Sequence, residues 1–94
     1  MNIHKSNLLA KMHAALPDLA VEAKERAVEF EQARMVALDY VAKLKKAGVY
    51  RVLVAEAQGG LGGDFIDWYE MSTTLAQADA STGWAAAHGA VANA

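Results

Sequence analysis

Histidine, cysteine and paired carboxylates carry much of enzyme chemistry, and this 94-residue sequence brings few of them together. His4, His13 and His88 lack the i,i+4 pairing with one another that a metal-binding helix needs. There is no cysteine, so thiolate nucleophiles, disulfides and zinc–thiolate sites are excluded. The spacing supports no Ser-His-Asp set and no carboxylate pair. We therefore predict no catalytic and no metal-binding residue in this chain.

Side chains suited to ligand binding gather near the C-terminus. Residues 80–94 contain no Asp, Glu, Lys or Arg, and they include Trp84 and His88. Trp84 stands among very small side chains, so we expect it to project beside free space unless another domain fills that space. His88 is either a binding residue or a hydrogen-bonded structural histidine, and general burial statistics favour the second. Trp68 is most simply a core residue.

A glycine-rich segment, Gln58-Gly59-Gly60-Leu61-Gly62-Gly63, follows a short apolar run, as in a nucleotide-binding turn. The G-x-G-x-x-G spacing fails, however, because the third glycine after Gly60 and Gly62 would fall at Phe65. No Walker lysine follows, and no room remains for a βαβ unit. A flexible loop between helices is the preferred interpretation.

Length and charge restrict the class of protein and its partners. The chain fits one compact domain, which we place over residues 1–94. Nine basic and eleven acidic residues give a formal charge of −2 without a basic cluster, so we expect no nucleic acid partner. The N-terminus lacks a secretory pattern and the uncharged C-terminal stretch is too short to span a bilayer, so we expect no membrane association. The lack of cysteine is typical of a cytoplasmic protein.

Hydrophobic spacing predicts three helices in the first half of the chain. The first covers residues 3–15, and Pro17 then interrupts it because a proline nitrogen cannot donate a hydrogen bond. The second helix is expected from Asp18 to Arg34. Its apolar stripe consists of Leu19, Ala23, Ala27 and Phe30. The third runs from about Met35 to Ala47, and Gly48 stops it. Its inward residues are expected to be Leu38, Val41 and Leu44.

The second half is expected to contain two further helices. The segment from Val49 to Val54 is rich in β-branched side chains, so it is expected to form a short strand or an extended connector. Asp64 suits the N-cap of a helix from Phe65 to Ala78. The expected inner face of that helix consists of Phe65, Trp68, Ser72 and Leu75. Capping groups in Asp79–Thr82 precede the last helix, Gly83 to Ala94. The predicted fold is therefore all-α, a small bundle of about five helices.

Several short motifs follow one another in a recognisable order. These are Leu44-Lys45-Lys46-Ala47-Gly48-Val49-Tyr50-Arg51, Leu53-Val54, Gly59-Gly60, Leu75-Ala76-Gln77-Ala78-Asp79 and Ala80-Ser81-Thr82-Gly83-Trp84. Over roughly Leu16 to Ala94, this order and spacing resemble the N-terminal domain of the acyl-CoA dehydrogenase superfamily. The Ala-Asp-x-Ser-x-Gly-Trp form looks most like the branch of flavin-dependent aromatic monooxygenases. One departure is Ala55, where the family usually has proline.

The resemblance implies that the chain is the N-terminal domain of a larger flavin-dependent oxidoreductase. In such enzymes this domain precedes a β-barrel domain and a C-terminal helical bundle, which are absent here, and FAD or FMN lies between those later parts. The resemblance further implies that the last helix forms one wall of the substrate cavity. The residues that would face an aromatic or acyl-CoA substrate are Trp84, Ala85, His88 and Gly89.

No catalytic or cofactor-binding residue is expected within this chain by itself. The resemblance implies the flavin-binding domains or a partner chain as partners, and a homo-oligomer. A hypothesis from a different class remains open: a free-standing, non-catalytic helical module that binds a partner through its apolar last helix.

Overall fold

A computed structural model describes residues 7–94, and His4 lies outside the described residues. The described part contains five α helices, two short 3-10 helices and no strand, which confirms the predicted all-α fold. The α helices are α1 (Asn7–Glu25), α2 (Ala27–Ala33), α3 (Leu38–Ala47), α4 (Phe65–Ala78) and α5 (Ala80–Ala92). The 3-10 helices are η1 (Val49–Arg51) and η2 (Glu56–Gln58).

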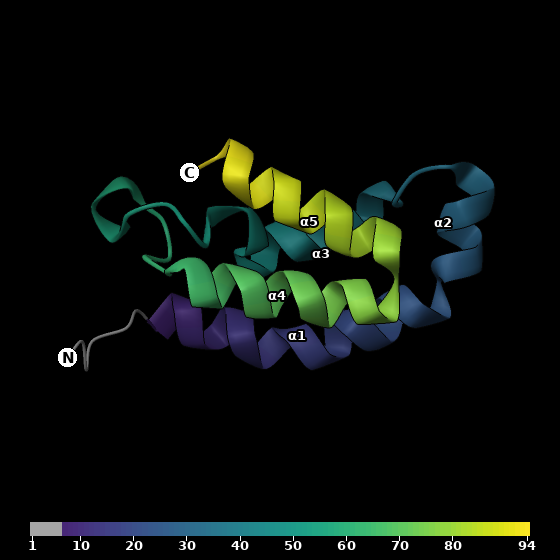
Figure 1. Cartoon of the computed structure of the whole chain (residues 1–94), viewed down its shortest axis with the longest axis horizontal. Helices are drawn as coiled ribbons and strands as arrows, with labels where there is room; N and C mark the ends of the chain where they lie inside the picture. The colour runs from purple at the N-terminus through teal and green to yellow at the C-terminus, as the bar shows by residue number, and fades with distance from the viewer. Residues whose placement is uncertain (1–6) are drawn as a thin grey trace.

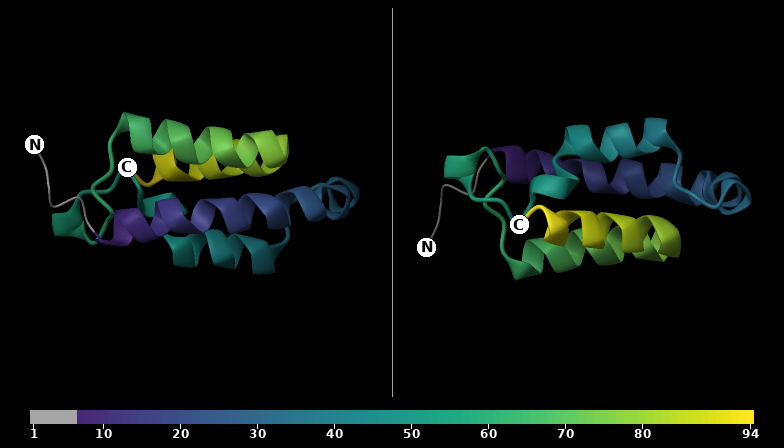
Figure 2. Two further views of the ribbon diagram at one scale, coloured as in Figure 1. Left: turned by 90° about the horizontal axis from the view of Figure 1, so that it is seen from below. Right: turned by 90° about the horizontal axis from the view of Figure 1, so that it is seen from above.

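The helices form two layers around one apolar core. Helices α4 and α5 run antiparallel in one layer, and α1 and α3 form the other, with α2 at one end (Figure 1; Figure 2). Helix α4 packs against both α5 and α1 and so connects the two layers. The largest fully buried side chains are Tyr40, Leu9, Met12, Leu44, Met71, Leu75, Val49, Val52 and Thr82.

The predicted break at Pro17 is wrong, because α1 continues through this residue from Asn7 to Glu25. A proline inside a helix removes one backbone hydrogen bond and crowds the preceding turn. The apolar residues on both sides of it share one face and are buried together: Leu9, Met12, Leu16, Leu19 and Ala23. Pro17 itself is exposed, so tertiary packing of this stripe outweighs the local cost.

The next two helices begin and end at different residues from those predicted. The expected helix from Asp18 to Arg34 is divided at Arg26 into the end of α1 and the short α2. Arg34 adopts a left-handed backbone conformation (φ 57°) and ends α2, so α3 begins only at Leu38. Leu38 is 74% exposed and not inward. Gly48 ends α3 with φ 94°, as the sequence predicts.

The β-branched segment after Gly48 forms the 3-10 helix η1 and not a strand or extended connector. Within the described residues there is no strand for it to pair with, and Val49 and Val52, three residues apart, are both buried in the core. The glycine-rich segment that follows is also more ordered than a flexible loop. Successive amides donate to backbone oxygens: Gly60 to Ala55, Leu61 to Arg51, Gly62 to Val54 and Gly63 to Val52.

Helix α4 has the predicted bounds, and Asp64 caps it through a reciprocal box with Asp67. The predicted inner face is wrong in part, because Asp67, Met71 and Leu75 are buried whereas Phe65 is 65% exposed. The buried arc is set by the contacts of α4 with both α1 and α5, which hydrophobicity alone does not reveal. Helix α5 begins at Ala80, three residues before the predicted start, because Asp79 is its N-cap.

Candidate functional site

Helix α5 is held against α4 by very small residues. Asp79 accepts hydrogen bonds from the backbone nitrogen and the hydroxyl of Thr82, at 2.8 and 2.6 Å, and so fixes the first turn. A β-carbon added at Gly83 would lie only 2.4 Å from the Cα of Ala76 on α4. This close approach fixes which face of α5 is buried. The buried face consists of Thr82, Gly83, Ala86 and Ala90.

The opposite face of α5 presents an aromatic pair to solvent. Trp84 is 68% exposed, and its ring lies 3.9 Å from the imidazole of His88, centroid to centroid, at an interplanar angle of 32°. His88 Nδ1 lies 3.0 Å from the carbonyl oxygen of Trp84. A carbonyl oxygen only accepts hydrogen bonds, so Nδ1 carries the proton in this contact. A neutral His88 then presents Nε2 as a hydrogen-bond acceptor.

The other two predicted substrate residues lie elsewhere on the helix. Ala85 borders a pocket of about 360 Å³ between α5 and the end of α2. This pocket is lined by Phe30, Glu31, Arg34, Met35, Val36, Ser81 and Ala85. Gly89 faces η1, where a β-carbon would lie 2.5 Å from the ring of Tyr50. The structure therefore brings Trp84 and His88 together on an exposed surface, while substrate contact by any of the four stays a prediction.

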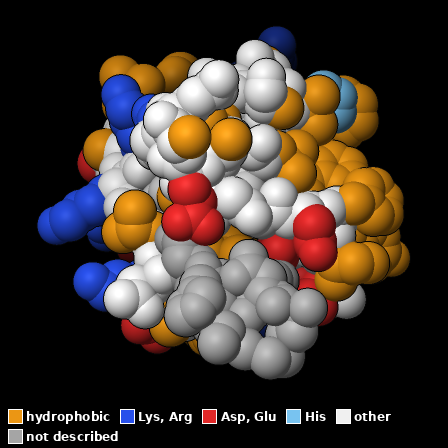
Figure 3. Space-filling model, turned by 90° about the vertical axis from the view of Figure 1, so that its left-hand side faces the viewer, with side chains coloured by type: hydrophobic (Ala, Val, Ile, Leu, Met, Phe, Trp, Pro, Cys, Tyr) orange, Lys and Arg blue, Asp and Glu red, His pale blue; other side chains and the backbone are white. Residues whose placement is uncertain are grey.

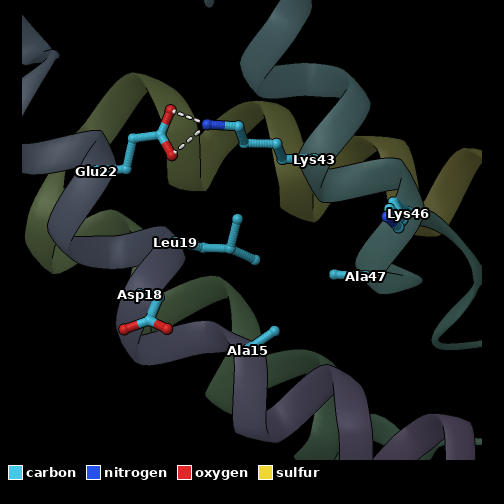
Figure 4. A pocket seen from close by; sticks show the side chains of 7 residues that line it. All are labelled: Ala15, Asp18, Leu19, Glu22, Lys43, Lys46 and Ala47. Atoms are coloured by element: carbon cyan, nitrogen blue, oxygen red, sulfur yellow. Dashed lines mark hydrogen bonds and ion pairs between the residues drawn. The ribbon is translucent and has the colours of Figure 1, made fainter.

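A second cavity, of about 420 Å³, lies between α1 and α3 (Figure 4). Its apolar wall is formed by Ala15, Leu19 and Ala47, and an ion pair between Glu22 and Lys43 at 2.8 Å bounds one side. Hydrogen bonds from Lys43 and then from Arg26 hold the pKa of the Glu22 carboxyl below its usual value. A carboxylate held ionised by two cations is a structural charge and a poor general acid.

Several acidic residues at the end of α1, in α2 and at the start of α3 form an ion-pair cluster with Arg26. Arg26 hydrogen-bonds Glu22, Glu29 and Asp39, with nitrogen–oxygen distances of 2.7 to 3.0 Å. This cluster joins residues of α1, α2 and α3. Glu22 and Glu29 lie at helical spacing from Arg26, but Asp39 lies thirteen residues away, so local spacing does not indicate its part in the cluster.

Sequence reasoning also missed the buried carboxylate of Asp67. Asp67 accepts a hydrogen bond from His13 Nε2 at 2.8 Å and another from the backbone nitrogen of Asp64 at 2.9 Å. His13 and Asp67 are separated by 54 residues, so no local pattern indicates the pair. Among residues 7–94 no group of three or more His, Cys, Asp or Glu side chains is placed to hold a metal ion. None of the described helices combines the length and apolar character that a membrane span requires.

The family of the chain follows from comparison with known proteins. The acyl-CoA dehydrogenase N-terminal domain model matches residues 9–94. The chain belongs to this family. The resemblance of the sequence to the acyl-CoA dehydrogenase N-terminal domain is therefore confirmed. It covers almost all of the described residues.

The curated relatives carry names from the monooxygenase branch. Indole-3-acetate monooxygenase of Acinetobacter baumannii is 41% identical over 92 residues, covering 88% of this chain and 24% of the relative. The oxygenase component of an FADH(2)-dependent resorcinol hydroxylase from a Rhizobium species is 36% identical over 63 residues, covering 67% of this chain and 15% of the relative. The oxygenase subunit HsaA of a flavin-dependent monooxygenase from Rhodococcus jostii is 34% identical over 76 residues, covering 81% of this chain and 19% of the relative.

These names agree with the branch that the sequence predicts. The chain spans about a quarter or less of the length of these relatives. No solved structure gives a significant match to it.

Proposed function

We propose that residues 1–94 form the N-terminal helical domain of a flavin-dependent oxidoreductase of the monooxygenase type, and that the exposed face of α5 is one wall of its substrate cavity. The exposed, tilted ring pair of Trp84 and His88 carries this proposal. An exposed indole on a helix without Asp, Glu, Lys or Arg provides a flat apolar surface, and the imidazole beside it adds one directional polar group.

The side chains on α5 fit a flat aromatic substrate. The Trp84 ring offers a stacking surface, and His88 Nε2 offers an acceptor for a hydroxyl or ring N–H group. Two of these relatives have names that include resorcinol or indole-3-acetate, both small aromatic compounds. We therefore assign substrate contact first to Trp84 and His88, whereas Ala85 borders the pocket between α5 and the end of α2. Gly89 lies against Tyr50 and acts mainly by letting η1 approach α5.

The flavin, FAD or FMN, is assigned to the part of the enzyme that this chain does not span. The glycine-rich segment is no phosphate cradle, because the amides of Gly60, Leu61, Gly62 and Gly63 already donate to backbone oxygens. When bound elsewhere in the enzyme, reduced flavin carries oxygen to the substrate. The residues of this chain bind and orient that substrate and help to exclude water. We further propose that the complete enzyme is a homo-oligomer located in the cytoplasm.

A chimaera provides the test: this chain replaces the matching quarter of the Acinetobacter baumannii enzyme, and turnover of indole-3-acetate is measured. Trp84→Ala and His88→Ala are each expected to lower kcat/KM by about three- to tenfold, the cost of losing a stacked or hydrogen-bonded contact. Leu38→Ala, a similarly exposed apolar residue on α3, serves as the control.

Two results would contradict the proposal. Unchanged kinetics in both α5 variants, with unchanged helical content by circular dichroism, would leave Trp84 and His88 as structural residues. A folded chimaera that neither shows yellow flavin colour nor binds added flavin would remove the oxidoreductase assignment.

A free-standing interaction module is the second candidate, and the exposed apolar residues of α4 and α5 favour it: Phe65, Ile66, Tyr69, Trp84 and Val91. A module of this kind would bind a partner chain with no flavin present. Retained partner binding together with an inactive chimaera would support the module over the enzyme domain.

A further inference from the structure

The pocket between α5 and the end of α2 has an apolar floor and a polar rim, and we call it the Arg34 pocket. Its volume of about 360 Å³ lies at the lower end of the range for small-molecule sites. Phe30 is buried and Val36 and Ala85 are half-buried, so these three residues form the floor. The rim consists of the exposed residues Glu31, Arg34, Met35 and Ser81. The floor suits the apolar part of a small molecule, and the rim suits its polar group.

The floor of the Arg34 pocket is held in place by its neighbours. Phe30 lies against the ring of Tyr40, with centroids 5.4 Å apart, and the Arg26 guanidinium carbon lies 5.1 Å from the centre of the Phe30 ring. Tyr40 is anchored in turn, because its hydroxyl donates to the carbonyl oxygen of Leu19 at 2.7 Å. A floor that is already fixed loses little conformational freedom when a ligand covers it.

Arg34 stands at the rim in a backbone conformation that favours glycine. Its φ of 57° and ψ of 30° lie in the left-handed region, which is unfavourable for a residue with a β-carbon. Among residues 7–94, the other residues with such a positive φ are all glycines: Gly48, Gly59 and Gly62. Glycine would end α2 equally well, because the cap is a backbone bond from Arg34 nitrogen to Glu31 oxygen at 3.1 Å. The arginine side chain is therefore retained at a conformational cost, which indicates a role beyond ending the helix.

The charge of Arg34 is not used within the domain. Its guanidinium has no ion-pair or hydrogen-bond partner in the part of the chain that the structure describes, whereas Arg26 contacts three carboxylates. An arginine presents its donors in a planar fork that matches a carboxylate, and the Ser81 hydroxyl across the pocket can donate one more hydrogen bond. Glu31 on the same rim repels a ligand of higher negative charge. The rim is therefore suited to a single carboxylate.

We propose that the Arg34 pocket is a binding site for a small aromatic monocarboxylic acid, whose ring lies on the floor and whose carboxylate contacts Arg34 and Ser81. The Phe30 ring favours an aromatic body for the ligand. Neither Trp84 nor His88 lines this pocket, so the site is distinct from the one proposed for the substrate and does not depend on that proposal. One guanidinium and one hydroxyl are too few donors to favour a phosphate dianion over a carboxylate.

An NMR titration of the ¹⁵N-labelled 94-residue chain tests this site, with phenylacetate as the probe and uncharged phenylacetamide as the matched compound. We expect phenylacetate to shift the amide signals of Phe30, Val36 and Ala85 in a saturable way, with a Kd of about 1–10 mM for so small a ligand. Phenylacetamide has the same ring without the charge, so it is expected to bind about fivefold more weakly or less.

Four variants of the chain separate the role of the side chain from that of the backbone. Arg34→Gln is expected to raise the Kd for phenylacetate about three- to tenfold, and Glu31→Gln to lower it about twofold. Lys46→Gln removes the same charge beside the other pocket and should leave the Kd unchanged. Arg34→Gly is expected to weaken binding as Arg34→Gln does, while its unfolding temperature stays equal or rises, because glycine relieves the left-handed conformation.

Five results would overturn the proposal. Amide shifts that do not saturate would show that there is no site, and equal binding of phenylacetate and phenylacetamide would show an apolar hollow only. Inorganic phosphate that shifts the same signals with an equal Kd would show a general anion site. Equal weakening in Arg34→Gln and Lys46→Gln would show nonspecific attraction by the net charge. Unchanged binding by Arg34→Gly, together with a fall in its unfolding temperature, would make Arg34 a structural residue.

Discussion

His13 and His88 carry the same imidazole, but their surroundings give them different roles. His88 bonds within its own helix and lies on an exposed face beside Trp84. His13 reaches from α1 to the buried carboxylate of Asp67 at the start of α4 and lies 3.9 Å from Glu70. A carboxylate that is nearly buried needs donors for both oxygens, and His13 and the backbone of Asp64 supply them. We therefore regard His13 as a structural residue and His88 as the binding residue.

For these single residues we predict that His13→Ala lowers the free energy of unfolding by about 1–3 kcal/mol, because the variant removes the imidazole donor from one Asp67 oxygen. Chemical denaturation followed by circular dichroism measures the change. His13→Gln should recover part of the loss because the amide donates a hydrogen bond. Lys11→Ala, an exposed change on the same helix, is the control. Equal stability of the His13→Ala and Lys11→Ala variants would contradict the structural role.

Pairs of helices decide how the candidate site is presented. Helix α5 turns Trp84 and His88 outward because Gly83, Ala86 and Ala90 fit closely against its neighbours. Larger residues on the inner face would push α5 away from α4 and rotate or displace the outer face. The small residues on the buried face of α5 do not contact solvent. Their close packing nevertheless fixes the orientation of the exposed face that carries Trp84 and His88.

Gly83→Ala tests this packing. Its β-carbon would meet the backbone of Ala76 at 2.4 to 2.6 Å, and a backbone cannot move aside as a side chain can. We expect a loss of about 1–3 kcal/mol in the free energy of unfolding, measured by denaturant titration. Ser81→Ala, on the exposed face of the same helix, is expected to change stability by less than about 0.5 kcal/mol. If Gly83→Ala were as stable as the parent chain, the close approach of α4 and α5 would be disproved.

Across the whole molecule, ion pairs and apolar surfaces occupy different regions. Arg26 and Lys43 join α1, α2 and α3 through Glu22, Glu29 and Asp39. The α4 and α5 layer has no basic residue and carries the exposed aromatic residues Phe65, Tyr69 and Trp84. On the face seen in Figure 3, the largest group of hydrophobic side chains lies on the side opposite to Lys and Arg. This separation gives the domain one side suited to water and one side suited to contact with protein and substrate.

The ion-pair side predicts a pH dependence of stability. The pKa of Glu22 is lowered from 4.5 in the folded chain, so the unfolded chain binds more protons as the pH falls through this range. The contribution of Glu22 is therefore present above about pH 4.5 and is lost progressively below it. Thermal unfolding of the parent chain and of Glu22→Gln should differ at pH 7, and the difference should shrink as the pH falls below about 4.5. Two curves that stay parallel across this range would contradict the assignment.

Local signals in the sequence determined much of this protein. The bounds of α4, the Asp64 cap, the Gly48 stop and the all-α class follow from spacing and capping, which act within a few residues. The order of the motifs also identifies the family. The pairing of Trp84 with His88 on one face is implied by their i,i+4 spacing, since residues four apart are neighbours on a helix.

Only the tertiary structure decided the remaining features, because they depend on contacts between distant segments. Packing of the α1 stripe carries the helix through Pro17, and the 3-10 helix Val49–Arg51 buries Val49 in the core. The two neighbours of α4 bury Asp67 and leave Phe65 exposed. Gly89 meets Tyr50 across the bundle. Sequence patterns report the periodicity of one helix, whereas burial depends on which helices pack on each of its sides.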